Sequence, residues 1–225
     1  MTEAEWLAAS DPDPTLAFFD ATVSHRKLRL FAVACCRRQP AANEAWDCWE
    51  NAAEVAEAFC DGRADSAAMD RAQANVESRL ELYPGEPVYN AGFWACGRDI
   101  VRDVIGAAFY SANLIASSQV EFSSRDHDDR YAAVREVERR CQCVILRDIF
   151  GNPFRPVTFS PSWLTTTAVG LAEAIYADRA FDRLPILADA LQDAGCEDEA
   201  ILAHCRGDGP HVRGCWVVDG VLGKG

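Results

Sequence analysis

The residues best suited to chemistry lie together near the C-terminus of the chain. His204, Cys205, His211 and Cys215 fall within twelve residues, in the spacing His-Cys-x5-His-x3-Cys. Imidazole and thiolate are the ligand types that zinc prefers in proteins. Neighbouring positions of a helix point about 100° apart, so His204 and Cys205 are awkward ligands for a single ion. We expect both thiols to be core residues and both imidazoles to cap backbone groups or face water, with a zinc site at this segment as the alternative.

Five arginines form a second candidate site, which would bind an anion. Each lies at an expected helix end or beside a turn rich in Gly and Pro: Arg37, Arg38, Arg155, Arg206 and Arg213. A guanidinium in such a place can hold a carboxylate or a phosphate through two parallel hydrogen bonds. It can equally stabilise a helix C-terminus or pair with an acidic neighbour. An anion-binding regulator and a set of internal ion pairs therefore remain alternatives.

The sequence contains none of the familiar catalytic motifs. Gly-x-Ser-x-Gly, His-Glu-x-x-His, Walker and dinucleotide-binding patterns are all missing. Cys35 and Cys36 lie mid-helix on an apolar face, where burial raises the pKa of a thiol and lowers its reactivity. We therefore expect no catalytic residues, lean against an enzyme, and expect no cofactor, with zinc at the C-terminal segment as the alternative.

The charge of the chain bears on its partners. The 225 residues include 22 Lys+Arg against 35 Asp+Glu, a formal net charge of −13. An acidic surface repels phosphate backbones, so we expect no nucleic-acid partner. No stretch approaches the roughly 18 uninterrupted apolar residues of a membrane span, so we expect no membrane association.

The ten cysteines raise the question of redox compartment. The opening residues 1–5 are acidic, and no basic leader precedes an apolar run, so a secretory signal is not indicated. We therefore predict a cytoplasmic protein whose thiols are reduced and buried as small hydrophobes. Cys141 and Cys143 could supply further zinc ligands from elsewhere in the fold.

Helical periodicity dominates the elements that must position these residues. Leu28, Phe31, Ala32, Cys35 and Cys36 recur at the spacing of one helix face and predict a central buried helix. Alternation with a period of two is absent over any useful length, so no strand is predicted. Other helices are expected near 42–60, 65–82, 91–117 and 128–149, and after Pro161 and Pro185.

These elements predict an all-α fold, either an irregular multi-helix bundle or a helical-repeat-like array of about ten helices. Residues 1–225 are expected to form a single helical domain, with possible subdomains 1–118 and 128–225 joined by a polar loop at 117–129. The helix near 128–149 is expected to bury its periodic apolar positions, namely Tyr131, Val134, Val137, Cys141, Val144, Ile145 and Ile149.

Several segments carry a resemblance to a known family. They are 26–38 (RKLRLFAVACCRR), 148–156 (DIFGNPFRP), 209–216 (GPHVRGCW) and the opening MTEAEWL. On these segments the chain resembles a family of uncharacterised bacterial proteins that occur as paralogues within large genomes. No activity is known for that family, so the resemblance transfers no catalytic residues. Residues 183–191 (RLPILADAL) are similar to the core of a short helical domain found beside repeats and signalling modules.

The sequence favours a non-enzymatic helical module that binds another protein. Trp94, Phe154, Phe159 and Trp163 lie in or beside expected loops, where a binding groove could form. Burial of each aromatic residue in the core is the competing interpretation. The alternatives are a metal-supported enzyme or zinc-stabilised domain that uses the His/Cys segment, and an anion-binding regulator that uses the arginines.

Overall fold

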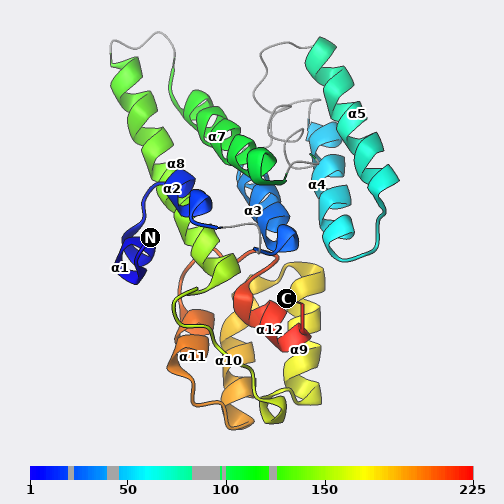
Figure 1. Cartoon of the computed structure of the whole chain (residues 1–225), viewed down its shortest axis with the longest axis vertical. Coiled ribbons are helices and arrows are strands. Elements are labelled where there is room, and N and C mark those ends of the chain that lie inside the picture. Colours follow the sequence, from blue (N-terminus) through cyan, green and yellow to red (C-terminus); the bar gives the residue numbers. More distant parts are fainter. Residues whose placement is uncertain (20–22, 40–45, 83–96, 98–99, 122–125, 225) are drawn as a thin grey trace. The chain divides into compact units, whose positions relative to one another are not determined.

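A computed structural model describes residues 1–19, 23–39, 46–82, 97, 100–121 and 126–224 of the chain (Figure 1). Within these residues the regular elements are eleven α-helices and two short 3-10 helices, and there is no strand. The predicted all-α, multi-helix fold is confirmed, because the apolar residues follow the helical period throughout the chain.

The chain divides into two compact units, Met1–Cys143 and Val144–Gly225, called here the N-terminal and the C-terminal unit. The division falls inside α8 (His127–Phe150), which contributes residues to both. The sequence placed a possible boundary at the polar stretch 117–129, where α7 (Ile100–Gln119) ends and α8 begins. Packing between helices, rather than local polarity, separates the units.

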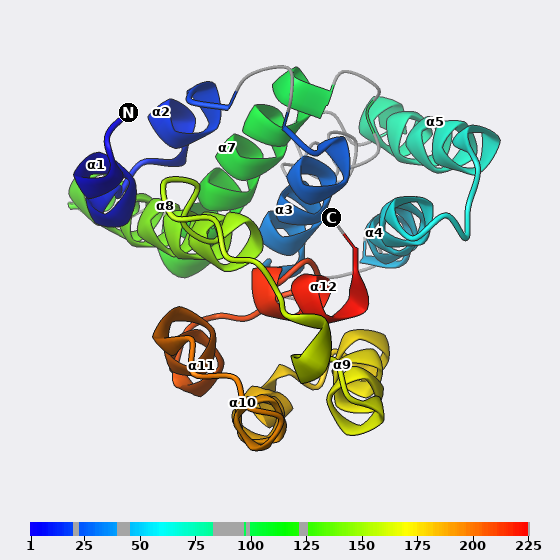
Figure 2. The ribbon, with the colours of Figure 1, turned by 60° about the horizontal axis from the view of Figure 1, so that its bottom comes forward.

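The N-terminal unit is centred on one helix, as the sequence predicts. Figure 2 shows α3 (His25–Arg37) between α4 (Trp46–Cys60) and α7, and α3 packs against both. Ser24 caps the start of α3 by accepting a hydrogen bond from the amide of Lys27, and all residues from Leu28 to Cys36 are buried. The described helices of the unit in chain order are α1 (Glu3–Ala8), α2 (Pro12–Ala17), α3, α4, α5 (Ser66–Leu82), α7 and the larger part of α8.

The buried face of α8 differs from the face that its apolar residues predict. Val137 was expected in the core but is 59% exposed, whereas the next residue, Glu138, is buried. Glu138 accepts two hydrogen bonds of 2.8 Å from Arg38 at the end of α3. Gln142 is also buried and donates to the backbone carbonyl of Ala108. Polar side chains with specific partners therefore occupy positions that periodicity assigns to apolar ones.

The C-terminal unit begins with the last turns of α8 and holds the candidate site. Its helices pack as neighbours, α9 on α10 and α10 on α11, while α12 packs on both α9 and α11 (Figure 2). Their buried side chains form one core that includes the thiols of Cys196, Cys205 and Cys215. The elements are η1 (Pro161–Trp163), α9 (Thr166–Asp178), η2 (Phe181–Arg183), α10 (Leu184–Asp193), α11 (Glu199–Arg206) and α12 (Trp216–Leu222).

Local signals fix the ends of these helices. Thr165 caps α9, and Asp198 caps α11 by accepting from the amides of Ala200 and Ile201. Gly195 follows α10 with φ of +90°, a conformation that glycine adopts at little steric cost, and so permits the tight reversal into α11. Among the described helices, none combines the length and the hydropathy that crossing a bilayer requires.

Candidate metal centre

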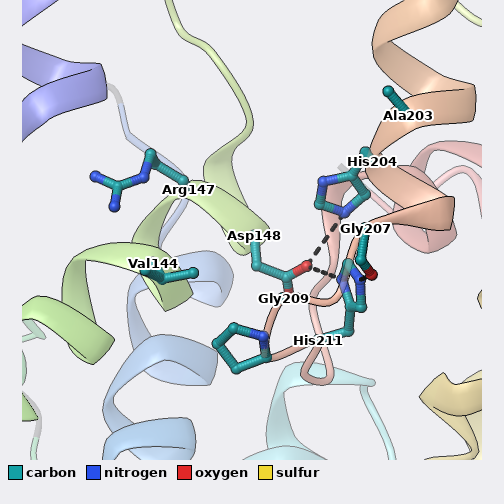
Figure 3. Close-up of a pocket in the computed structure, with 9 residues that line it drawn as sticks. Val144, Arg147, Asp148, Ala203, His204, Gly207, Gly209 and His211 are labelled. Atoms are coloured by element: carbon teal, nitrogen blue, oxygen red, sulfur yellow. Dashed lines mark hydrogen bonds and ion pairs between the residues drawn. The ribbon is translucent and has the colours of Figure 1, made fainter.

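Four side chains from four places in the C-terminal unit converge on one point. Asp148 lies in the last turn of α8, His204 in the last turn of α11, His211 in the connection after α11, and Cys215 at the start of α12. One potential ligand atom from each residue lies within 4.8 Å of all the others. Figure 3 shows the Asp148 carboxylate between the two imidazole rings.

The separations suit a four-coordinate ion. Ligand atoms about 2.0–2.3 Å from a tetrahedral ion lie roughly 3.3–3.7 Å from one another. Nε2 of His204 is 3.2 Å from Oδ1 of Asp148 and 3.2 Å from Sγ of Cys215. Nδ1 of His211 is 2.6 Å from the same Asp148 oxygen. An ion could enter with shifts of less than about 1 Å.

Hydrogen bonds make both contacts of His204 Nε2 only if a single proton is shared between them. Nε2 of His204 faces both a carboxylate oxygen and a sulfur, yet a ring nitrogen carries at most one proton. If Nε2 donates to Asp148, it has no lone pair for the thiol of Cys215. If it accepts from that thiol, it has no proton for Asp148. A cation placed among the four atoms satisfies every contact at once.

Neighbouring backbone groups hold the candidate ligands in place. The second oxygen of Asp148, Oδ2, accepts a 2.9 Å hydrogen bond from the amide of Val212. Nε2 of His211 lies 3.3 Å from the carbonyl oxygen of Gly207, so this nitrogen can donate while Nδ1 turns inward. Ligating histidines and carboxylates in metal sites are usually oriented by such outer hydrogen bonds.

A tight turn delivers Cys215 to the cluster. The amide of Cys215 donates a 2.9 Å hydrogen bond to the carbonyl of Val212, which closes a turn over these four residues. Gly214 within it has φ of +99°, a region that other residues rarely adopt. The sequence Val-Arg-Gly-Cys is thus what allows the chain to reverse between His211 and α12.

Burial and charge shift the pKa values of the cluster. Burial raises the pKa of Asp148, but hydrogen bonds from His204 and His211 outweigh it, and the net pKa is lowered. Burial lowers the pKa of His211, and its hydrogen bond to Asp148 outweighs that, so the net pKa is raised. Burial, together with the charge of Asp148, raises the pKa of Cys215 well above its usual value. In the absence of a metal, Cys215 is therefore a protonated thiol and a poor nucleophile.

The cluster is closed at one end and open at the other. Cys215 is fully buried, while the side chains of His211 and His204 are 9% and 18% exposed. A cavity of about 190 Å³ lies against the two histidines and Asp148. Its remaining lining residues are Val144, Arg147, Ala203, Gly207, Gly209 and Pro210.

The structure brings together three of the four predicted zinc ligands, His204, His211 and Cys215. Cys205 is not in the group of converging atoms; it is a fully buried core residue whose pKa is raised to about 12, chiefly by burial. The fourth member is Asp148, which the sequence did not single out. Asp148 precedes an apolar pair at the end of a long helix, and its spacing from the His/Cys segment carries no signal.

Four of the five arginines of the predicted anion site have internal partners in the described residues. Arg37 pairs with Glu57 at 2.9 Å, and Arg206 pairs with Asp189 at 2.7 Å. Arg38, as described above, pairs with Glu138. Arg213 donates to the carbonyl of Tyr176 and stacks over its ring, and Arg155 lies in the exposed turn after α8. The internal pairing that the sequence offered as the alternative accounts for three of the five.

The aromatic residues of the predicted protein-binding groove have different surroundings. Phe159 and Trp163 are partly buried against the core of the C-terminal unit. Phe154 is 37% exposed, and Trp94 lies outside the described residues. Protein interaction stays a prediction.

Comparison with known proteins adds no relative from which a role could be carried over. The chain matches no protein-family model, no curated protein and no solved structure. The resemblance to a paralogue-rich bacterial family therefore stays a prediction, and the chemistry of the site rests on its own geometry.

Proposed function

We propose that this protein binds one zinc ion through Asp148, His204, His211 and Cys215, and that the ion stabilises the C-terminal unit. The observation that supports this most is the single ring nitrogen of His204 at 3.2 Å from both an oxygen and a sulfur. A bound cation meets both contacts, whereas in a hydrogen-bond network one proton of Nε2 must be shared between the oxygen and the sulfur.

The donor set favours zinc among the common metals. One thiolate, two imidazoles and one carboxylate match the sulfur, nitrogen and oxygen ligands that zinc accepts in tetrahedral sites. Calcium and magnesium prefer six or more oxygen ligands, which this cluster does not offer. The carboxylate is a harder ligand than copper(I) selects. With two neutral imidazoles, the charges of Asp148 and Cys215 balance the two charges of the ion.

The ion would act as a structural cross-link. It joins the end of α8, the end of α11, the connection at 207–215 and the start of α12. Binding of a structural zinc ion contributes about 10–16 kcal/mol in small zinc-finger peptides. A whole domain is typically stable by only about 5–15 kcal/mol. The ion would therefore dominate the stability of a unit this small.

Two matched cysteine variants test the proposal. Cys215→Ser removes the candidate thiolate, and Cys205→Ser makes the same chemical change at an equally buried core position outside the cluster. Metal is measured by elemental analysis of the purified full-length chain after dialysis. We expect close to one zinc per chain in the parent and in Cys205→Ser, and little in Cys215→Ser.

Two results would contradict the proposal. One is a parent chain that holds no metal even after incubation with zinc and dialysis. The other is equal zinc retention in the two variants, which would mean that Cys215 is not a ligand. Retention of copper or iron in place of zinc would keep the site and change the assigned ion.

A further inference from the structure

The cavity beside the cluster touches only part of the candidate ligand set. It is lined by Asp148, His204 and His211, while Cys215 is fully buried and does not line it. In a tetrahedral arrangement, three ligands define a face, and the fourth lies on the opposite side of the ion. The cavity therefore borders the three residues whose ligand atoms would form the face opposite the sulfur.

We infer that a small anion can enter this cavity and bind the metal as a fifth ligand opposite Cys215. The inference rests on the proposed zinc site. Zinc in catalytic sites, which keep an open position, sometimes expands from four to five ligands. A metal site that is enclosed on all sides has no room for a fifth ligand. This cluster differs from such a site because a cavity lies beside it.

The volume of the cavity sets the class of ligand. About 190 Å³ exceeds the roughly 30 Å³ that one water molecule occupies in the liquid. It falls below the roughly 300–1,000 Å³ of pockets that hold drug-sized molecules. The fitting ligand is therefore an anion of a few heavy atoms with one donor end, such as a small carboxylate or azide.

Among the groups around the cavity, the metal ion would be the main binding partner of the anion. Val144, Ala203 and Pro210 are apolar, and the guanidinium of Arg147 points away from Asp148 in Figure 3. Gly207 and Gly209 carry no side chains, which keeps this part of the wall thin. An anion in the cavity would bind through the ion itself, beside the apolar side chains of the wall.

Gly209 offers a way to fill the cavity without disturbing the ligands. A Cβ added there would meet only Cε1 of His211, at 4.0 Å, and Gly209 is not among the glycines with positive φ. Gly209→Leu should therefore occupy space in the cavity while the backbone stays unstrained. Gly170→Leu is the matched control, because a Cβ at that exposed helical position meets nothing within 4 Å.

The test uses the full-length chain with cobalt(II) in place of zinc, because cobalt reports its coordination number through visible absorption. Sodium azide is the probe. We expect a saturable spectral change with azide in the parent and in Gly170→Leu. In Gly209→Leu we expect the same azide-free spectrum and azide affinity weaker by at least about tenfold, because overpacking opposes entry.

The outcomes separate the two proposals. A chain that takes up cobalt with a tetrahedral thiolate spectrum but does not respond to azide overturns the open position and leaves the metal site intact. Equal azide affinity in Gly209→Leu and Gly170→Leu also overturns it, because the anion would then bind elsewhere. A chain that takes up no cobalt overturns the metal site and this inference together.

Discussion

At the scale of single residues, Asp148 organises the candidate centre. Its Oδ1 faces both histidines and its Oδ2 accepts from the amide of Val212, although the side chain is only 3% exposed. A buried carboxylate is costly unless charge or hydrogen bonds compensate it, and here both are present. Asparagine at this position would keep an oxygen for the metal but would not supply the negative charge of Asp148.

We predict that Asp148→Asn weakens zinc binding by at least about tenfold, because the side chain keeps its shape but loses its charge. The affinity is measured by competition with a chromophoric zinc chelator. Asp189→Asn, which makes the same change at an exposed carboxylate paired with Arg206, should leave the affinity unchanged. Equal affinities for the two variants would remove Asp148 from the ligand set.

The pKa of His211 predicts how zinc binding depends on pH. Because the folded pKa of His211 is raised, the metal-free chain gains stability from its protonated form below about pH 6.5 and loses it as pH rises through the folded pKa. The lowered pKa of Asp148 has the opposite pH dependence. The stability that ionised Asp148 contributes is present above about pH 3.9 and is lost as pH falls through the folded pKa. Zinc must displace the proton of His211, so the affinity for zinc rises with pH. It rises over the same pH range in which the metal-free chain loses the stability that protonated His211 provides.

The difference in Tm between the zinc-loaded and the metal-free chain should therefore widen from about pH 6 to about pH 8. Thermal unfolding of the two forms at several pH values measures it. A difference that stays constant or narrows over this range would argue that the imidazoles do not ligate the ion.

The same residues show what the sequence could reveal about the site. His204, His211 and Cys215 stand out because imidazole and thiolate side chains recur within one short segment. Cys205 was included for the same reason, yet as the neighbour of His204 on a helix it points elsewhere, into the core. Asp148 comes from another helix, and only the tertiary fold brings it to the cluster.

At the scale of helices, α8 combines two ion pairs of different environments. Glu138 pairs with Arg38 of α3, and its side chain is 3% exposed. Glu136 pairs with Arg140 one turn further along the same helix, and its side chain is 61% exposed. The two glutamates therefore allow the effect of burial to be compared within one helix.

Removal of Glu138 should destabilise the protein much more than removal of Glu136. For Glu138→Ala we expect a loss of about 2–3 kcal/mol, because a half-buried arginine is left without its partner. For Glu136→Ala we expect no more than about 0.5 kcal/mol, since exposed pairs at this spacing contribute little. Urea unfolding of the full-length variants measures both, and comparable losses would contradict the structural role of the Arg38–Glu138 pair.

Helical periodicity predicts α3 well and α8 poorly, for a physical reason. Nearly all positions of α3 from Leu28 to Cys36 are apolar, so whichever face of this helix turns inward is apolar. In α8 the apolar and polar positions compete, and Glu138, Gln142 and Asp148 are buried because each has a specific partner. Such partners lie far away in the sequence, so Val137 was assigned to the core although it faces solvent.

At the scale of the whole molecule, the site lies entirely within one of the two compact units. All four candidate ligands belong to the C-terminal unit, as do the residues that line the cavity. The all-α class follows from sequence period alone, whereas the division inside α8 depends on which helices pack together. Local polarity at 117–129 carried no information about that packing.

We predict that removal of zinc destabilises the C-terminal unit selectively. A ligand present at 100 times its dissociation constant stabilises the folded state by about 2.7 kcal/mol, and chelation removes this contribution. Hydrogen exchange of the full-length chain should show faster exchange in α11, α12 and the connection between them after chelation. The amides of α3 and α4 should keep their protection, and equal changes in both units would contradict a local structural ion.

X-ray absorption at the zinc edge of the purified full-length protein tests the central proposal most directly. We expect one sulfur at about 2.3 Å and three nitrogen or oxygen neighbours at about 2.0–2.1 Å. A shell of nitrogen and oxygen alone, or one with two or more sulfurs, would contradict the assignment of Asp148, His204, His211 and Cys215 as the ligands.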